Sequence, residues 1–279
     1  MCARFLLTLT AVTASLLTFS CSSGPSGPEK GTPAFYWSAA KETFGAGDYS
    51  KTLDHLGNLL KKENEYRAQA YPWYLVLSTG LTHGYMQMAD RFETGARMNK
   101  TNPGAFRRLV SNYRRSAREL SLGFVEAFDG FQTAVTTPQV DLAFPYPSGS
   151  PAESVTIGRV AGGILPPDAE IETAQTAELK RAVLLAVARA TGSGDDTTKA
   201  QALFKTTPVK ISRATFNQAM AFALYDHAML YDPKKMDEPS RMELMLNRAS
   251  AALKGIPQDR AVKELSGKID KAQKTLKKT

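Results

Sequence analysis

Three histidines, His55, His83 and His227, are the residues of this chain best suited to binding a metal or moving a proton. They stand far apart in the sequence, and only His227 has a carboxylate neighbour, Asp226. Adjacent helical positions point in different directions, so this pair is not spaced to hold one ion. The sequence therefore predicts ordinary surface or core histidines and no metal site.

Two short motifs with catalytic or phosphate-binding counterparts are incomplete. Residues 38–41 spell S-x-x-K, the spacing of serine-acylating penicillin-binding enzymes, but neither S-D-N nor K-T-G occurs in the chain. The glycines of residues 158–163 are not followed by Lys-Ser or Lys-Thr, as a phosphate-cradling loop requires. The sequence predicts no enzyme activity and no cofactor.

Arginines concentrate on one side of a predicted helix that includes residues 106–131. Arg107, Arg114 and Arg118 project within a narrow arc, which Arg108 and Arg115 flank. Apolar side chains occupy the opposite side, namely Phe106, Leu109, Val110, Tyr113, Leu120, Phe124 and Phe131. Arginine binds carboxylate and phosphate groups in a bidentate way, so this stripe is suited to docking an acidic partner or a phosphate-bearing lipid. A plain solvated helix face is the alternative.

An aromatic cluster precedes the basic helix. Its members, at helical spacing, are Tyr66, Tyr71, Trp73, Tyr74 and Tyr85. Such a set can line a groove that stacks on the ring of a small molecule or sugar. Aromatic residues at helical spacing are also typical of a protein core, which is the alternative.

The N-terminal segment has the order of an export signal. Residues 5–19 are uncharged and mostly apolar behind Arg4, and Cys21 arrives before the roughly 20 apolar residues that a transmembrane helix needs. The run Leu17-Thr18-Phe19-Ser20-Cys21 resembles the lipobox of bacterial lipoprotein signals, although Thr18 departs from the aliphatic residue usual there. The resemblance implies that residues 1–20 are a cleaved signal peptide and that Cys21 carries acyl chains such as palmitate. An ordinary secretory signal is the alternative.

Residues 21–33 are rich in Ser, Gly and Pro and have no apolar periodicity, so we expect a lipidated cysteine followed by a flexible tether of roughly 20 Å. Enterobacterial lipoproteins that stay at the inner membrane carry an aspartate after the cysteine. By resemblance, Ser22 favours anchoring in the outer membrane, facing the periplasm.

The charge balance bears on the kind of partner. The net charge of +8 becomes +7 once residues 1–20 are removed, because that segment contains Arg4 and no acid. A high isoelectric point is the usual sign of a nucleic-acid partner, but an exported, lipid-anchored protein rarely meets one. Anionic lipid or an acidic envelope protein fits better, and no nucleic acid is expected.

The body reads almost wholly as helix, with two short amphipathic helices broken at Gly47-Asp48 as its first unit. Its two apolar stripes are Tyr36, Ala39, Ala40 and Thr43, and then Leu53, Leu56, Leu59 and Leu60. This pattern resembles a tetratricopeptide repeat (TPR), a helical hairpin that buries its faces by stacking on its neighbours. Thr52 and Leu59 stand where the repeat commonly has alanine.

Weaker copies of the pattern follow. Inner faces are predicted at Leu179, Ala182, Val183 and Ala186; at Ala200, Leu203 and Phe204; at Phe216, Ala219, Met220 and Ala223; and at Met245, Ala249, Ala252 and Leu253. A capping helix with Val262, Leu265, Ile269, Ala272 and Leu276 inside ends the chain. We expect an all-α, irregular, right-handed solenoid of TPR-like hairpins, with a helical bundle as the alternative.

A Pro/Gly-rich segment, residues 137–172, separates helical hairpins over 34–136 from those over 173–279. It contains Phe144, Tyr146, Val155, Ile157, Ile164 and Leu165, enough apolar mass to predict an ordered loop laid across the helices. A disordered linker is the alternative.

The resulting hypothesis is a membrane-anchored TPR-like lipoprotein of the cell envelope that binds proteins or peptide segments as a scaffold or assembly factor. Residues 21–62 are similar to TPR lipoproteins of outer-membrane barrel-assembly machines and to those associated with TRAP-type transporters. The second resemblance keeps an accessory ligand-binding lipoprotein for nutrient uptake as the alternative. A cell-wall enzyme is a third.

Overall fold

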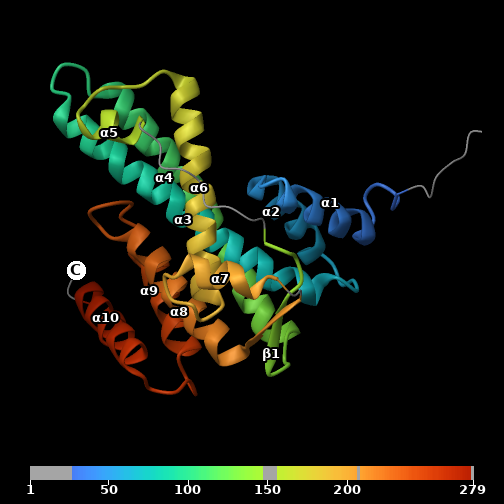
Figure 1. The fold of residues 1–279 in the computed structure, drawn as a ribbon. Helices are drawn as coiled ribbons and strands as arrows, with labels where there is room; N and C mark the ends of the chain where they lie inside the picture. Colours follow the sequence, from blue (N-terminus) through green and yellow to red (C-terminus); the bar gives the residue numbers. More distant parts are fainter. Residues whose placement is uncertain (1–26, 147–155, 206–207, 278–279) are drawn as a thin grey trace, which may run out of the picture.

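The computed structural model describes residues 27–146, 156–205 and 208–277, and within these ranges the chain is mostly helical (Figure 1). Helix accounts for 72% of the described residues and strand for 3%, against about a third helix in an average soluble protein, so the all-α prediction is confirmed. The elements in chain order are α1 (Pro33–Gly45), α2 (Tyr49–Leu60), α3 (Arg67–Met98), α4 (Gly104–Ala134), β1 (Gln139–Leu142), α5 (Thr156–Ala161), α6 (Asp168–Ala190), α7 (Thr197–Leu203), β2 (Val209–Ser212), α8 (Arg213–Ala228), the 3-10 turn η1 (Met229–Tyr231), α9 (Pro239–Ala252) and α10 (Arg260–Leu276).

The first two helices form the predicted hairpin. Thr32 caps α1, with its hydroxyl accepting from the amide of Phe35 at 3.2 Å, and Asp48 caps α2. Gly47, at φ +74°, makes the turn between them, as glycine can do without a steric penalty. The buried face of α1 is Trp37, Ala40 and Phe44, whereas the predicted Tyr36, Ala39 and Thr43 are half buried. The predicted face is therefore rotated slightly about the helix axis relative to the face that is buried.

Helices α3 and α4, of 32 and 31 residues, pack along each other as a hairpin far longer than α1 and α2. Helix α3 runs through the middle of the fold and contacts α2, α4, α5, α6 and α8 (Figure 1). Its crossing with α6 is a backbone-to-backbone approach, because a Cβ atom added at Gly80 would lie 2.5 Å from the Cα of Val183. Gly84, one turn later, packs against Leu179 and Ala182 in the same way.

The predicted loop 137–172 contains more regular structure than the sequence indicated. Strand β1 pairs antiparallel with β2, with Val140 opposite Ile211, and α5 and the start of α6 lie within the same range. Phe144 is fully buried and stacks on Trp73, as a packed segment requires. The prediction was wrong for Ile164 and Leu165, which are 60% and 40% exposed. Residue 155 and the side chain of residue 157 lie outside the described part.

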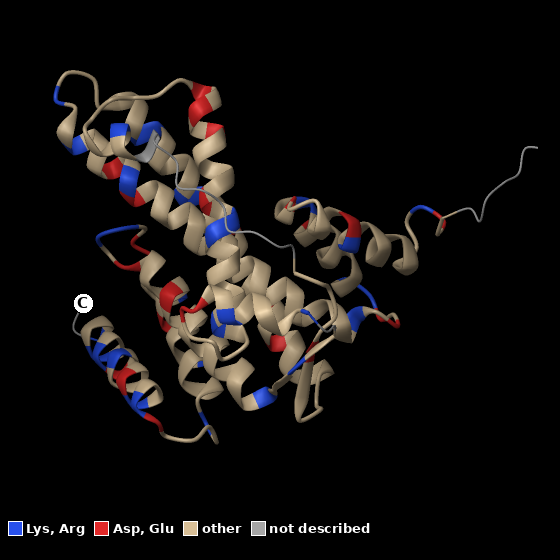
Figure 2. Ribbon diagram, in the orientation of Figure 1, with Lys and Arg blue, Asp and Glu red and all other residues tan. Residues whose placement is uncertain are grey.

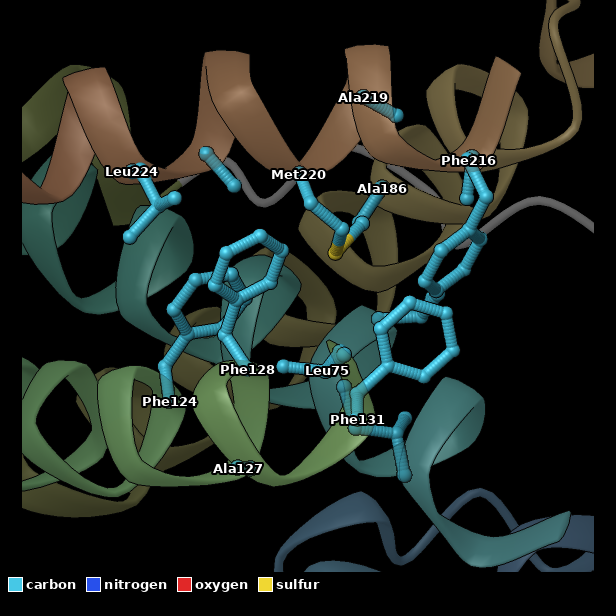
Figure 3. Close-up of a cluster of buried hydrophobic side chains, with 14 of the residues drawn as sticks. Leu75, Phe124, Ala127, Phe128, Phe131, Ala186, Phe216, Ala219, Met220 and Leu224 are labelled. Atoms are coloured by element: carbon cyan, nitrogen blue, oxygen red, sulfur yellow. The ribbon is translucent and has the colours of Figure 1, made fainter. Parts of the chain in front are cut away.

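The C-terminal helices build the larger core. The predicted inner faces of α6, α8 and α9 are all buried, and α8 and α9 pack as a hairpin that α10 covers. Figure 3 shows where α8 meets the rest, with Phe124, Phe128 and Phe131 of α4 facing Phe216, Met220 and Leu224 of α8. Helix α6 packs chiefly on α3 rather than on the short α7. The structure therefore joins both halves of the chain through α3, α4, α6 and α8.

The Gly80 crossing leads to a stability prediction. Gly80→Ala places a methyl group against the backbone of Val183, which cannot turn aside, so we expect the free energy of unfolding to fall by on the order of 1–3 kcal/mol or more. Gly267→Ala, in α10 with open space around it, is the matched control and should raise stability by up to about 1 kcal/mol. Denaturant unfolding of both variants measures the difference. Equal stabilities would contradict the close approach.

Candidate functional site

A basic hollow lies at the end of the α3–α4 hairpin, where the last turns of α3 face the first turns of α4. Its volume is about 590 Å³. Figure 2 shows several Lys and Arg residues at this end of the hairpin, with Asp and Glu residues among them. The residues that line the hollow are Glu93, Ala96, Arg97, Asn99, Lys100, Pro103, Arg107, Val110, Ser111 and Arg114. Four of them are cationic and one is acidic.

The loop below the hollow is held by one side chain. The carboxamide oxygen of Asn99 accepts from the amides of Thr101 (3.1 Å) and Asn102 (2.8 Å), and its nitrogen donates to the carbonyl of Gly163 at 3.1 Å. Gly95, one turn earlier, leaves the space that the ring of Phe106 fills. These contacts fix the turn and bring α3 and α4 together at the hollow.

The structure divides the predicted arginine stripe. Arg107 and Arg108 are exposed, while Arg114 donates to Glu93 Oε2 at 2.7 Å. Arg118 lies further along α4 and binds Glu238 at 2.8 Å, and Arg115 donates to Asn112 at 2.6 Å. Of the five predicted residues, Arg107 and Arg114 therefore line the hollow.

Two further cations of the hollow were missed by the sequence analysis. Arg97 and Lys100 come from the end of α3 and the loop that follows it. A short connection between two long helices places the end of the first beside the start of the second, and this signal could have grouped them with Arg107.

The predicted aromatic cluster does not form one groove. Trp73 is fully buried between Phe44 and Phe144, at ring-centroid distances of 4.5 and 5.6 Å. Tyr66 stacks on Trp37 and Tyr85 on Tyr113, at separate places. Tyr71 and Tyr74 do line one hollow of about 610 Å³ between α2, α3 and α4, where their hydroxyls lie against Gly130 and Gly123. Packing accounts for most of this cluster.

The structure places the three histidines at two locations. His55 lies beside the rings of Phe35 and Tyr36. His83 of α3 and His227 of α8, far apart in the chain, line the same cavity. Within the described ranges, no group of three or more His, Cys, Asp or Glu side chains is placed to hold a metal ion.

Burial governs the protonation of these two histidines. His227 is 2% exposed, and the ring of Phe124 meets it edge-on at 4.7 Å. Desolvation lowers the pKa of His227 to about 3, with a smaller contribution from His83. Desolvation also lowers the pKa of His83, whose Nε2 lies 2.6 Å from Nε2 of Gln87. Both rings are therefore neutral at pH 7.

The lipidation site predicted at Cys21 lies outside the described residues, as do the signal peptide and the tether up to residue 26. In the part of the chain that the structure describes, no helix combines the length and apolarity needed to cross a bilayer.

The buried His227 gives the chain a specific acid sensitivity. Between pH 6.5 and about 3 the unfolded chain binds a proton at this residue and the folded chain does not, so the free energy of unfolding falls as the pH falls through that window. The loss amounts to about 1.4 kcal/mol per pH unit. We expect His227→Phe to flatten this part of the pH dependence, measured by denaturant unfolding at neutral and mildly acidic pH. A variant that loses stability with acid as steeply as the wild type would contradict this assignment.

Similarity to known proteins suggests no function for the basic hollow or for the cavity that His83 and His227 line. No protein-family model matches the chain, and neither a curated protein nor a solved structure matches it significantly. The functional argument therefore depends on the residues and geometry of this chain.

Proposed function

We propose that this protein is a lipid-anchored scaffold or assembly factor of the bacterial cell envelope, which binds an acidic segment of a partner protein in the basic hollow. The observation that carries the proposal is the local excess of positive charge there. Arg97, Lys100, Arg107 and Arg114 line one hollow, and its one acid, Glu93, already pairs with Arg114.

Two of these cations are available to a partner. Among the described residues, neither Lys100 nor Arg107 takes part in an ion pair, and both are exposed. Arg97 donates only to the hydroxyl of Thr94, at 3.3 Å. Arginine binds carboxylates with two parallel hydrogen bonds, so the aspartates and glutamates of an acidic segment suit this site.

The position of the hollow favours a protein partner over the membrane that would hold the anchor. Figure 1 shows α1, which follows the N-terminal segment, well apart from the α3–α4 hairpin end. An anchor at Cys21 would therefore attach the chain to the bilayer on the α1 side. The long hairpin then presents the basic hollow away from that attachment.

The proposal includes the TPR-like, right-handed solenoid. Support comes from the α1–α2 hairpin, which has two short helices, a Gly47-Asp48 turn and packing of α2 on α3, as we expect of a repeat unit. The length of α3 and α4 departs from the repeat. Stacked helical hairpins commonly expose extended surfaces for peptide segments, as a scaffold needs.

The anchor can be tested by itself. We expect Cys21→Ser to move the protein from the membrane fraction to the soluble fraction and to abolish acyl labelling, because acyl chains contribute about 0.8 kcal/mol per buried methylene. Ser26→Ala, in the same segment, is the control and should stay with the membrane. Identical fractionation of the wild type and Cys21→Ser would remove the lipoprotein part of the proposal.

The hollow is tested by removing the two of its cations whose side chains form neither an ion pair nor a hydrogen bond among the described residues, Lys100 and Arg107. The double variant Lys100→Gln/Arg107→Gln should retain fewer crosslinked envelope proteins, and capture by the wild type should weaken as salt rises, since charges are screened within about 10 Å at 0.1 M ionic strength. The matched control is Lys263→Gln/Lys271→Gln on α10, which removes the same charge from two exposed lysines that form no ion pair among the described residues.

The proposed binding at the hollow is supported if Lys100→Gln/Arg107→Gln loses capture of envelope proteins and the control variant keeps it. Equal capture by the two double variants contradicts it. Binding to anionic vesicles that only the Lys100→Gln/Arg107→Gln variant loses, with protein capture unchanged, would assign the hollow to lipid instead. Melting temperatures of all three proteins should agree closely, because solvent-facing substitutions usually change stability by less than about 0.5 kcal/mol.

A further inference from the structure

A second cavity lies earlier along α3 than the basic hollow, between α3, α6 and the end of α8, and has a volume of about 370 Å³. That is roughly a dozen water volumes, or the size of a monosaccharide or an amino acid. Its polar lining includes Thr82, His83 and Gln87 of α3 and His227 of α8. Nothing in the proposed docking function uses this space.

Three buried polar atoms of the lining have no hydrogen-bond partner among the described residues. They are Oγ1 of Thr82 and both ring nitrogens of His227, on side chains that are each 2% exposed. Leaving a buried donor or acceptor unpaired costs about 1–3 kcal/mol, so folded proteins contain few such atoms. Three at one cavity indicate that something from outside the chain completes them.

Thr82 stands out from the other hydroxyl residues of its helix. Ser78, Thr79 and Thr94 each donate to the carbonyl four residues earlier, at 2.7, 2.8 and 3.0 Å. This back-bonding is what a threonine inside a helix ordinarily does when nothing else is offered. The hydroxyl of Thr82 does not, and it remains free to bind a guest.

The polar groups at the buried side of the cavity are uncharged, and each can both donate and accept hydrogen bonds. A neutral imidazole has one N–H donor and one acceptor nitrogen, and a hydroxyl or carboxamide both donates and accepts. The charged residues of the lining lie toward solvent. Their charges cancel, because two are cationic, Arg189 and Lys235, and two are acidic, Asp90 and Asp226. Arg189 already donates to Asp195 at 2.8 Å. This lining disfavours a guest with net charge.

From these contacts we infer that the cavity is a binding site for a small molecule without net charge, whose hydroxyl or amide groups hydrogen-bond to Thr82 and His227. Met86, Leu185 and Met229 supply an apolar wall for the body of the molecule. A partly apolar, half-open space with a few convergent polar groups is typical of small-molecule sites.

The test uses the whole chain and follows its melting temperature, which rises when a ligand binds the folded state. D-Glucose, myo-inositol and L-glutamine are the probes, since they carry hydroxyl or amide groups and no net charge. Glutarate and 1,5-diaminopentane are charged comparators of similar size. We expect at least one of the three probes, and neither comparator, to raise the melting temperature in a concentration-dependent way.

Two threonine variants, one turn apart, locate the binding. Thr82→Val should weaken the apparent affinity about tenfold, the usual worth of one strong hydrogen bond, and should raise the melting temperature of the ligand-free protein by removing an unpaired hydroxyl. Thr79 lines the same cavity, but its hydroxyl already donates to the carbonyl of Leu75, so Thr79→Val is the matched control for a change of shape alone and should keep the affinity. A purely structural Thr82 would give the opposite, a lower melting temperature in Thr82→Val.

The proposal is wrong if no probe shifts the wild type, because the cavity then holds water alone. It is equally wrong if Thr82→Val and His227→Phe bind as the wild type does, or if Thr79→Val loses affinity as Thr82→Val does. The Lys100→Gln/Arg107→Gln variant should bind the probe normally. Its behaviour separates failure of this inference from failure of the proposed docking function.

Discussion

The close approach of α3 and α6 at Gly80 and Gly84 is the constraint on which the rest of the structure depends. Any side chain at Gly80 would meet the backbone of Val183, so the helices can touch only because this position has none. Further along the same pair, the carboxylate of Glu178, 1% exposed, is bound by Arg91 from α3 and Arg181 from α6. Breaking such a buried ion pair from one side leaves an uncompensated charge. This crossing therefore joins the N-terminal hairpins to the C-terminal core, together with the α4–α8 contact and the β1–β2 pair.

That crossing also shapes both hollows. Because α6 lies against the middle of α3, the last turns of α3 extend past the large core and pair with α4 alone, apart from the cover given by α5 and the start of α6. The basic hollow forms at this extension. Thr82 and His83 lie between the two glycines, beside the contact with α6, so the polar cavity opens next to the crossing. A closely packed helix pair thus positions both candidate sites, and the loop after α3 contributes Asn99 and Lys100 to the hollow.

The sequence was sufficient for the helices and insufficient for their arrangement. Periodicity identified the buried faces of α6, α8 and α9, because each face is a local property of one helix. The β1–β2 ribbon was missed, although Val140 and Leu142 alternate with polar residues as a half-buried strand does. Val209 and Ile211 show the same signal, but four-residue segments are easily overlooked. The sequence could not predict that His83 and His227 line one cavity, because the spacing of distant residues does not determine which helices pack against each other.

Net charge alone does not say where an acidic partner would bind. Helix α10 is also basic, with exposed lysines at positions 263, 268, 271 and 274. Those lysines stand on one convex helix and are strongly hydrated point charges on flexible stems, so an anion gains little by meeting any of them. In the hollow, cations from two helices face the same space and one of them is fixed by Glu93. Convergence, rather than the number of charges, is what makes the α3–α4 end the better site for a carboxylate.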